Sequence, residues 1–183
     1  LTVACLDENE CMVFGSGAAQ EMHRRWFVSD LDKFEVNYKN RSDEFHGISI
    51  AGPNSRKVLE KIVRDDVSNE KFKFRDSRRM FVGGVPSIIN RISFTGELGY
   101  EIYVAPHYQI KLYEELMEAG REFNIKPFGG RALMSMRLEK IWGAWTLDYR
   151  PDFTAKETGL DMFINWDKDF IGKEKATSEN SSS

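Results

Sequence analysis

Glu97 is the acidic residue of this sequence that is best placed to bind a ligand. It stands between two glycines in the segment Thr95-Gly96-Glu97-Leu98-Gly99. An ionised carboxylate accepts hydrogen bonds through both oxygens, so it can hold two neighbouring N–H donors on the edge of a ring. The residue types alone favour the plainer interpretation, which is a turn residue with a solvated side chain.

Arg131 is the second candidate, because a guanidinium offers paired donors to a ligand or a pocket wall in a geometry that lysine does not reproduce. Arg137 is its rival, but with Glu139 on the same predicted helix it is better explained by structural ion pairs. Three aromatic residues are suited to stacking on a flat ring system, although core packing explains any one of them better. They are Phe94, Tyr100 and Trp145.

Cys5 and Cys11 flank the polar segment Asp7-Glu8-Asn9-Glu10, so a hairpin here would bring them near one another. Without a secretory signal we interpret them as two free thiols on neighbouring strands, with a redox or metal pair as the less favoured alternative. The histidines show no metal-ligand spacing with these cysteines, and no metal site is predicted. The histidines are His23, His46 and His107.

Strands and helices that must position these residues alternate along the chain. Residues 1–5 and 11–15 predict a hairpin, and the apolar residues of 18–31 recur at helical spacing. Gly83-Gly84 joins two predicted strands with the positive backbone angles of a tight hairpin. The other predicted elements are strands over 47–51, 79–82, 85–94 and 100–104, and helices over 53–64, after 106 and over 130–141.

The order strand, helix, strand, strand, strand, helix predicts an α+β domain with a ferredoxin-like, split strand–helix–strand portion. The predicted helix 130–141 is apolar nearly all round, which indicates burial, and 159–166 is predicted to be extended. Residues 177–183 are polar and low in complexity, so we expect a disordered tail. One domain is therefore predicted over residues 1–176.

The segment Ile92–Glu101, which reads Ile-Ser-Phe-Thr-Gly-Glu-Leu-Gly-Tyr-Glu, resembles the central motif of the glycine-cleavage T-protein (aminomethyltransferase) superfamily. Later stretches resemble further motifs of that superfamily, in the same order and at compatible distances. They are Gly130-Arg131-Ala132, Met136–Lys140, Trp145, Glu157–Leu160 and Phe170–Lys173. Within the superfamily the chain is most similar to the folate-binding domains of dimethylglycine and sarcosine dehydrogenases and oxidases, from Leu1 to about Ala176.

This resemblance implies an aminomethyltransferase-type folate-binding domain, which moves a one-carbon unit from a methylated amine or aminomethyl donor to tetrahydrofolate. It assigns Glu97 to the donor edge of the reduced pterin. The other cofactor-binding residues that it implies are Arg131, Thr2, Val13, Gly15, Tyr100 and Trp145. FAD would belong to a separate upstream domain, so the expected partners are the folate, the amine donor and a flavin domain or subunit.

The family's catalytic aspartate stands immediately before the strand that matches Leu1-Thr2-Val3, so we expect no catalytic residue in this sequence. By the same resemblance the domain is expected to be truncated at its N-terminus and to lack the C-terminal β-barrel. A non-catalytic folate sensor and a scaffold that retains only the fold are the alternatives.

Composition argues against two classes of partner. With 26 Lys and Arg against 29 Asp and Glu, the formal net charge is -3, so no overall positive field attracts nucleic acid. No apolar stretch approaches the roughly 18 residues of a membrane span, and no signal-peptide pattern opens the sequence. We expect a cytoplasmic protein, or a mitochondrial-matrix protein in a eukaryote.

Overall fold

The computed structural model describes residues 1–145, 147–150 and 152–180. The chain divides into two compact units, Leu1–Lys140 and Ile141–Ser183, whereas the sequence predicted one domain over 1–176. The strands of the larger unit are β1 (Thr2–Asp7), β2 (Glu10–Phe14), β3 (His46–Ala51), β4 (Ser77–Val82), β5 (Val85–Asn90) and β6 (Gly99–Val104). Its helices are α1 (Gln20–Asp30), α2 (Ser55–Ile62), α3 (Gln109–Gly120) and α4 (Gly130–Glu139).

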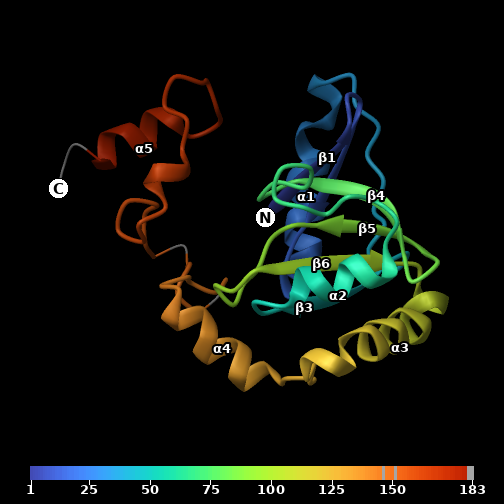
Figure 1. Cartoon of the computed structure of the whole chain (residues 1–183). Coiled ribbons are helices and arrows are strands. Elements are labelled where there is room, and N and C mark those ends of the chain that lie inside the picture. Colours follow the sequence, from blue (N-terminus) through green and yellow to red (C-terminus); the bar gives the residue numbers. More distant parts are fainter. Residues whose placement is uncertain (146, 151, 181–183) are drawn as a thin grey trace. The chain divides into compact units, whose positions relative to one another are not determined.

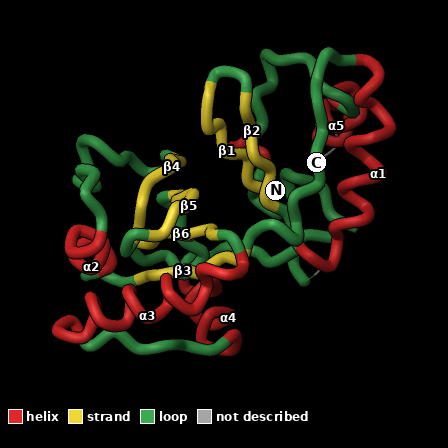
Figure 2. The backbone as a smooth tube through the Cα atoms, turned by 90° about the vertical axis from the view of Figure 1, so that its right-hand side faces the viewer, coloured by secondary structure: helices red, strands yellow, loops and turns green. Residues whose placement is uncertain are grey.

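An antiparallel sheet with the strand order β3-β6-β5-β4 is the centre of the larger unit (Figure 1). Helices α2 and α3 lie on one side of this sheet, and the separate hairpin of β1 and β2 lies on the other, together with α1 (Figure 2). An antiparallel sheet with its packing helices on one face belongs to the α+β class, so the predicted mixture of helices and strands is confirmed.

The core lies between the sheet and the two helices. On β6, Tyr100, Ile102 and Val104 are each 0% exposed and pack among the apolar residues of α2 and α3. Since side chains alternate between the two faces of a strand, the intervening Glu101 and Tyr103 face the hairpin. The core face of β6 is therefore apolar, and its hairpin face carries polar groups.

The hairpin is attached to its side of the sheet by one ring contact and one ion pair. The rings of Phe14 and Tyr103 lie 4.3 Å apart between centroids. Arg79 Nη2 donates to Glu10 Oε1 at 2.5 Å, which ties β2 to β4. This hydrogen bond from Arg79 holds the pKa of the Glu10 carboxyl below its ordinary value.

Several local predictions are confirmed. The hairpin β1–β2, the helix α1 and the strands β3, β4 and β6 lie where the sequence pattern placed them, within two residues at each end. Gly83 and Gly84 have φ angles of 58° and 75°, so the tight turn between β4 and β5 uses the conformation that glycine adopts without strain. The strand predicted over 85–94 ends earlier, at Asn90.

The predicted split strand–helix–strand portion is wrong for this sheet. Strands β3 and β4, which flank α2 in the chain, lie at opposite edges with β6 and β5 between them. Because all three strand pairings are antiparallel, β3 and β4 run in opposite directions, whereas that motif joins parallel strands. The order of elements along the chain did not specify which strand pairs with β3.

Three predictions about the second half of the chain also differ from the structure. Helix α4 was predicted to be buried, but Arg137 is its one buried residue and Leu138 is 59% exposed. The segment predicted as extended over 159–166 contains a 3-10 turn at Asp161–Phe163. Residues 177–180 of the predicted tail lie in the helix α5 (Lys173–Asn180), and 181–183 lie outside the described residues. Every helix in the described ranges is too short or too polar to span a bilayer.

Candidate functional site

A row of polar residues crosses the sheet on the face that the hairpin covers. The strand registers pair Ser77 with Asn90, Asn90 with Glu101, and Glu101 with Ser49. Residues that are directly paired in antiparallel strands point to the same face, so these four side chains form one line across β4, β5, β6 and β3. We call Ser77, Asn90, Glu101 and Ser49 the polar row.

Glu101 supplies the carboxylate of the polar row. Its side chain is partly buried, and its Oε2 accepts a hydrogen bond of 2.7 Å from the hydroxyl of Tyr103. Burial, followed by the charge and the hydrogen bond of Glu101, raises the pKa of Tyr103, so this hydroxyl remains a donor well above neutral pH. Tyr103 thus fixes one oxygen of the carboxylate and leaves the other oxygen for a further donor.

Asn90 is the buried amide of the row. The residue is 1% exposed, and neither its Oδ1 nor its Nδ2 has a hydrogen-bond partner among the described residues. A buried polar group without a partner costs about 1–3 kcal/mol, and such groups are rare in folded proteins. An amide that offers both a donor and an acceptor beside Glu101 matches a ligand edge that carries both kinds of group.

The loop from Arg91 to Leu98 closes the end of the sheet at which the polar row lies. Ser93 Oγ and Thr95 Oγ1 share a hydrogen bond of 2.8 Å, and Thr95 Oγ1 accepts the backbone N–H of Glu97 at 3.3 Å. Lys140 Nζ donates to the Ser93 carbonyl oxygen at 2.5 Å, which joins the end of α4 to the loop. Hydrogen bonds therefore order the backbone of this loop while the Glu97 side chain stays outside them.

Glu97 and Arg131, the two leading predictions from the sequence, both have exposed side chains. Neither lines either of the two cavities described below, and the same holds for Glu101 and Asn90 of the polar row. Neither makes an ion pair within the part of the chain that the structure describes. In the larger unit, Glu97 is thus a loop residue at the same end of the sheet as the polar row and does not lie in an enclosed cleft.

Val13 and Gly15, two of the three predicted hairpin residues, line a cavity of about 470 Å³ between the hairpin, α1 and the segment 37–45. Thr2 is paired with Phe14 in the hairpin but is not part of that lining. Tyr103 lines the same cavity, and through its hydroxyl the cavity is connected to Glu101. The structure thus joins part of the predicted hairpin site to the polar row.

Charged side chains around this cavity are already paired with one another. Arg24 Nε lies 2.9 Å from Glu21 Oε2, and Lys39 and Arg41 both contact Glu44, at 2.7 and 2.6 Å. The hydrogen bonds from Lys39 and then Arg41 hold the pKa of the Glu44 carboxyl below its ordinary value. The cavity therefore has a balanced charge rather than a strongly positive one.

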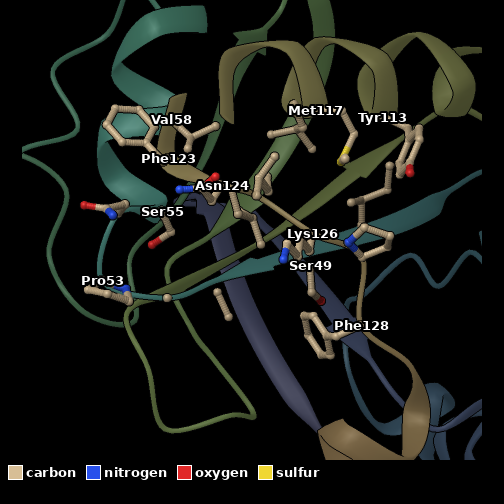
Figure 3. Close-up of a pocket in the computed structure, with 18 residues that line it drawn as sticks. Ser49, Pro53, Ser55, Val58, Tyr113, Met117, Phe123, Asn124, Lys126 and Phe128 are labelled. Atoms are coloured by element: carbon tan, nitrogen blue, oxygen red, sulfur yellow. The ribbon is translucent and has the colours of Figure 1, made fainter. Parts of the chain in front are cut away.

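A second cavity, of about 540 Å³, lies along the edge strand β3 and is mostly apolar. It is enclosed by β3, the start of α2, the C-terminal half of α3 and the segment 123–128 (Figure 3). In Figure 3, Tyr113 and Met117 line it from α3, while Ser49, Lys126 and Phe128 line another part of its wall. Ser49 is its one residue in common with the polar row, and it contains none of the residues predicted from the sequence.

Tyr100 and Trp145 are the two remaining predicted residues. Tyr100 is 0% exposed, and its ring stacks on Phe72 at 5.8 Å between centroids, so core packing explains it. Trp145 belongs to the smaller unit, where it is 43% exposed and forms an isolated bridge with Tyr149. In the same unit, Trp142 contacts Tyr149 edge to face.

Sequence patterns alone missed Glu101, Asn90 and Tyr103. One signal was present: β6 alternates apolar residues with Glu101 and Tyr103, which predicts a polar face on that strand. A second was that the apolar strand β5 ends in an asparagine, a residue that is depleted in strands. That these three side chains lie together depends on the strand registers, which no local sequence pattern revealed.

The family model described as the GCVT N-terminal domain matches residues 1–168 of the chain. The chain belongs to the GCVT N-terminal domain family. The predicted membership of the aminomethyltransferase superfamily is therefore confirmed.

Relatives of this GCVT domain include enzymes of two kinds. Human mitochondrial dimethylglycine dehydrogenase is 38% identical over 179 residues, which cover 95% of this chain and 21% of that protein. An aminomethyltransferase of Caldanaerobacter subterraneus is 31% identical over 176 residues, which cover 95% of this chain and 46% of that protein. This GCVT domain thus spans from about a fifth to about a half of the length of these relatives.

A solved structure supports the fold. Heterotetrameric sarcosine oxidase from Corynebacterium sp. U-96, in complex with pyrrole 2-carboxylate, matches with a TM-score of 0.55 and 18% sequence identity. The match covers 69% of this chain and 63% of that chain. At this identity the likeness concerns the fold alone.

Proposed function

We propose that this GCVT domain binds tetrahydrofolate and takes part in transferring a one-carbon unit to it from a methylated amine or aminomethyl donor. The observation that carries the proposal is the polar row, in which the Glu101 carboxylate lies beside the orphaned amide of Asn90. A reduced pterin has N–H and NH₂ donors next to a carbonyl acceptor, which complement a carboxylate and an amide. Family membership supports the same function.

In this proposal Glu101 accepts hydrogen bonds from the donor edge of the pterin, and Tyr103 orients the carboxylate through its 2.7 Å hydrogen bond. Asn90 contributes the amide, and Val13 and Gly15 contribute to the hairpin wall. Bound tetrahydrofolate would supply the nitrogen atoms that take up the one-carbon unit. The role of the protein is then to orient the ring and exclude water, which makes the transfer local.

Glu97, Arg131, Thr2 and Trp145 remain predicted ligand contacts. Tyr100 was predicted as one too, but it lies on the core face of β6, opposite to Glu101, so it is not a contact in this proposal. We also propose that the domain acts as part of a longer enzyme, in which FAD binds to a separate domain or subunit that oxidises the amine. The support for this is that the chain spans 21% of a dimethylglycine dehydrogenase. The cytoplasmic or mitochondrial location belongs to the same proposal.

The test is isothermal titration of tetrahydrofolate into the full chain and into two matched variants, Glu101→Gln and Glu97→Gln. A hydrogen bond to a charged, partly buried group is worth about 1.5–3 kcal/mol, so Glu101→Gln should weaken binding about 10- to 100-fold. Glu97 is exposed, where such interactions contribute about 1 kcal/mol or less, so Glu97→Gln should weaken it about fivefold or less.

Each outcome decides between the interpretations. If only Glu97→Gln strongly weakens tetrahydrofolate binding, the ligand contact is Glu97 in the loop, as the sequence predicted, and the proposed role of Glu101 is contradicted. Binding by the wild type without any one-carbon turnover when the amine and a flavin partner are supplied would favour a folate sensor. No binding by the wild type would leave a scaffold and overturn the proposal.

A further inference from the structure

Cys5 and Cys11 form a cross-strand pair of thiols at the outer end of the hairpin. They are directly paired in the β1–β2 register, and their sulfur atoms lie 3.2 Å apart. Paired residues of antiparallel strands have Cα atoms about 4.5–5.5 Å apart, which falls within the range that a disulfide spans. The two sulfurs need to approach by little more than 1 Å to reach the bond length of about 2.05 Å.

Both thiols are accessible to a small reagent. Each cysteine is exposed and free, and the neighbouring Ala4 points to the opposite face of β1, where it is 2% exposed. The ladder between the two strands shifts register between Cys5 and Asp7. Such an irregularity increases local twist, so the hairpin has some freedom to adjust as the sulfurs approach.

We infer that Cys5 and Cys11 are a thiol–disulfide exchange site that is oxidised to an intramolecular disulfide by a low-molecular-weight disulfide such as glutathione disulfide. The Cys5 thiolate attacks glutathione disulfide, which forms a mixed disulfide and releases one glutathione thiolate. The Cys11 thiolate then attacks the Cys5 sulfur, which closes the protein disulfide and releases the second glutathione. Two protein thiols and one glutathione disulfide thus give one protein disulfide and two glutathione molecules.

The order of attack follows from the hydrogen bond between the two sulfurs. The Cys11 thiol donates to the Cys5 sulfur, and this hydrogen bond raises the pKa of Cys11 above its ordinary value. Cys11 therefore keeps its proton to a higher pH than an ordinary thiol, so Cys5 is the first nucleophile and Cys11 the resolving thiol. Because Cys11 also lines the 470 Å³ cavity, the disulfide would form at the rim of that cavity.

The test is incubation of the full chain with glutathione disulfide, followed by intact-mass analysis and thiol titration under native conditions. The wild type should lose both titratable thiols and the mass of two hydrogen atoms, remain a single chain on a non-reducing gel, and recover with reduced glutathione. Cys11→Ser should instead stop at a stable mixed disulfide and gain one glutathione unit.

A matched control moves one thiol to the other face of the hairpin. In Cys11→Ser/Met12→Cys the chain keeps two thiols, but a shift of one residue along a strand reverses the side on which the side chain lies. This variant should form no intramolecular disulfide. Oxidation of the control as fast as the wild type, double glutathionylation of the wild type, or a disulfide between two chains would each overturn the inference.

Discussion

Replacing Asn90 by leucine should stabilise the larger unit, although most substitutions of a buried residue destabilise a protein. Asn90 is 1% exposed, and both polar atoms of its amide lack a partner among the described residues. Asn90→Leu removes a desolvation cost of about 1–3 kcal/mol and replaces the amide with an apolar group of similar shape. For a chain of this size the expected rise in Tm is about 2–12 °C.

The matched control is Ile88→Ala, which lies two residues earlier on the same face of β5 and is 5% exposed. It removes buried methyl groups and leaves a cavity, so it should cost about 2–5 kcal/mol. Urea denaturation compares the two variants, and native-state hydrogen exchange of the β5 and β6 amides shows whether the effect is located in the sheet. The two variants should shift the unfolding midpoint in opposite directions.

The same Asn90→Leu variant should lose tetrahydrofolate binding, because the group that is costly in the free protein is the group proposed to contact the ligand. Stability and binding would then change in opposite senses in one variant. A loss of stability as large as that of Ile88→Ala would show that the amide has partners in solution, and the reasoning that marks Asn90 as a ligand group would be refuted.

Three further predictions concern the hairpin, the sheet face and the β4–β5 turn. Arg79 lowers the pKa of Glu10, so the stability that Glu10 adds is present above the ordinary pKa of a glutamate and is lost as pH falls through the lowered pKa. In urea denaturation, the difference in unfolding free energy between wild type and Glu10→Gln should therefore disappear on acidification. Burial raises the pKa of Tyr103, so its contribution to the free energy of unfolding is present below about pH 10 and is lost above it. The stability of Tyr103→Phe should therefore fall less than that of the wild type as pH rises above about 10. Gly83→Ala should lower the Tm more than Gly84→Ala does. Both glycines have positive φ, so an alanine at either position is strained by about 1–2 kcal/mol. Only at position 83 would the added Cβ also lie 2.6 Å from a side-chain atom of α3.

Local chemistry explains which parts of the fold were predictable. The turn at Gly83-Gly84 and the hairpin before Gly15 follow from residue types within a few positions, and both were predicted correctly. The strand order was not predictable in this way, because the partner of β3 is β6, about fifty residues away in the chain. The burial of α4 was overestimated, because an apolar composition does not reveal whether another element packs against the helix.

The same distinction between local and long-range information applies to the candidate site. Motif resemblance directed attention to Glu97, which the structure places in an exposed loop, while Glu101 four residues later lies on a strand and is partly buried. Both acidic residues belong to the same short segment, so the region predicted from the sequence contains both Glu97 and the Glu101 of our proposal, and the titration of the two variants decides between them. What distinguishes them in the structure is that Glu101 lies on β6 and is paired with Asn90 of β5, whereas Glu97 lies in the loop before β6.

The polar row also conflicts with the way the rest of the sheet is built, and this conflict is the strongest physical reason to regard it as functional. Most other strand and helix residues of the larger unit agree with their surroundings, with apolar side chains in the core and paired charges outside, although the Tyr100 hydroxyl is also buried without a partner among the described residues. Asn90 departs from this pattern with both polar atoms of its amide, at a buried strand position. Local inconsistencies that a stable fold tolerates are expected at binding sites, where a ligand supplies the missing partners. A rise in the stability of Asn90→Leu would show that the amide is unsatisfied in the free protein, and a loss of tetrahydrofolate binding by the same variant would then separate a binding domain from a scaffold.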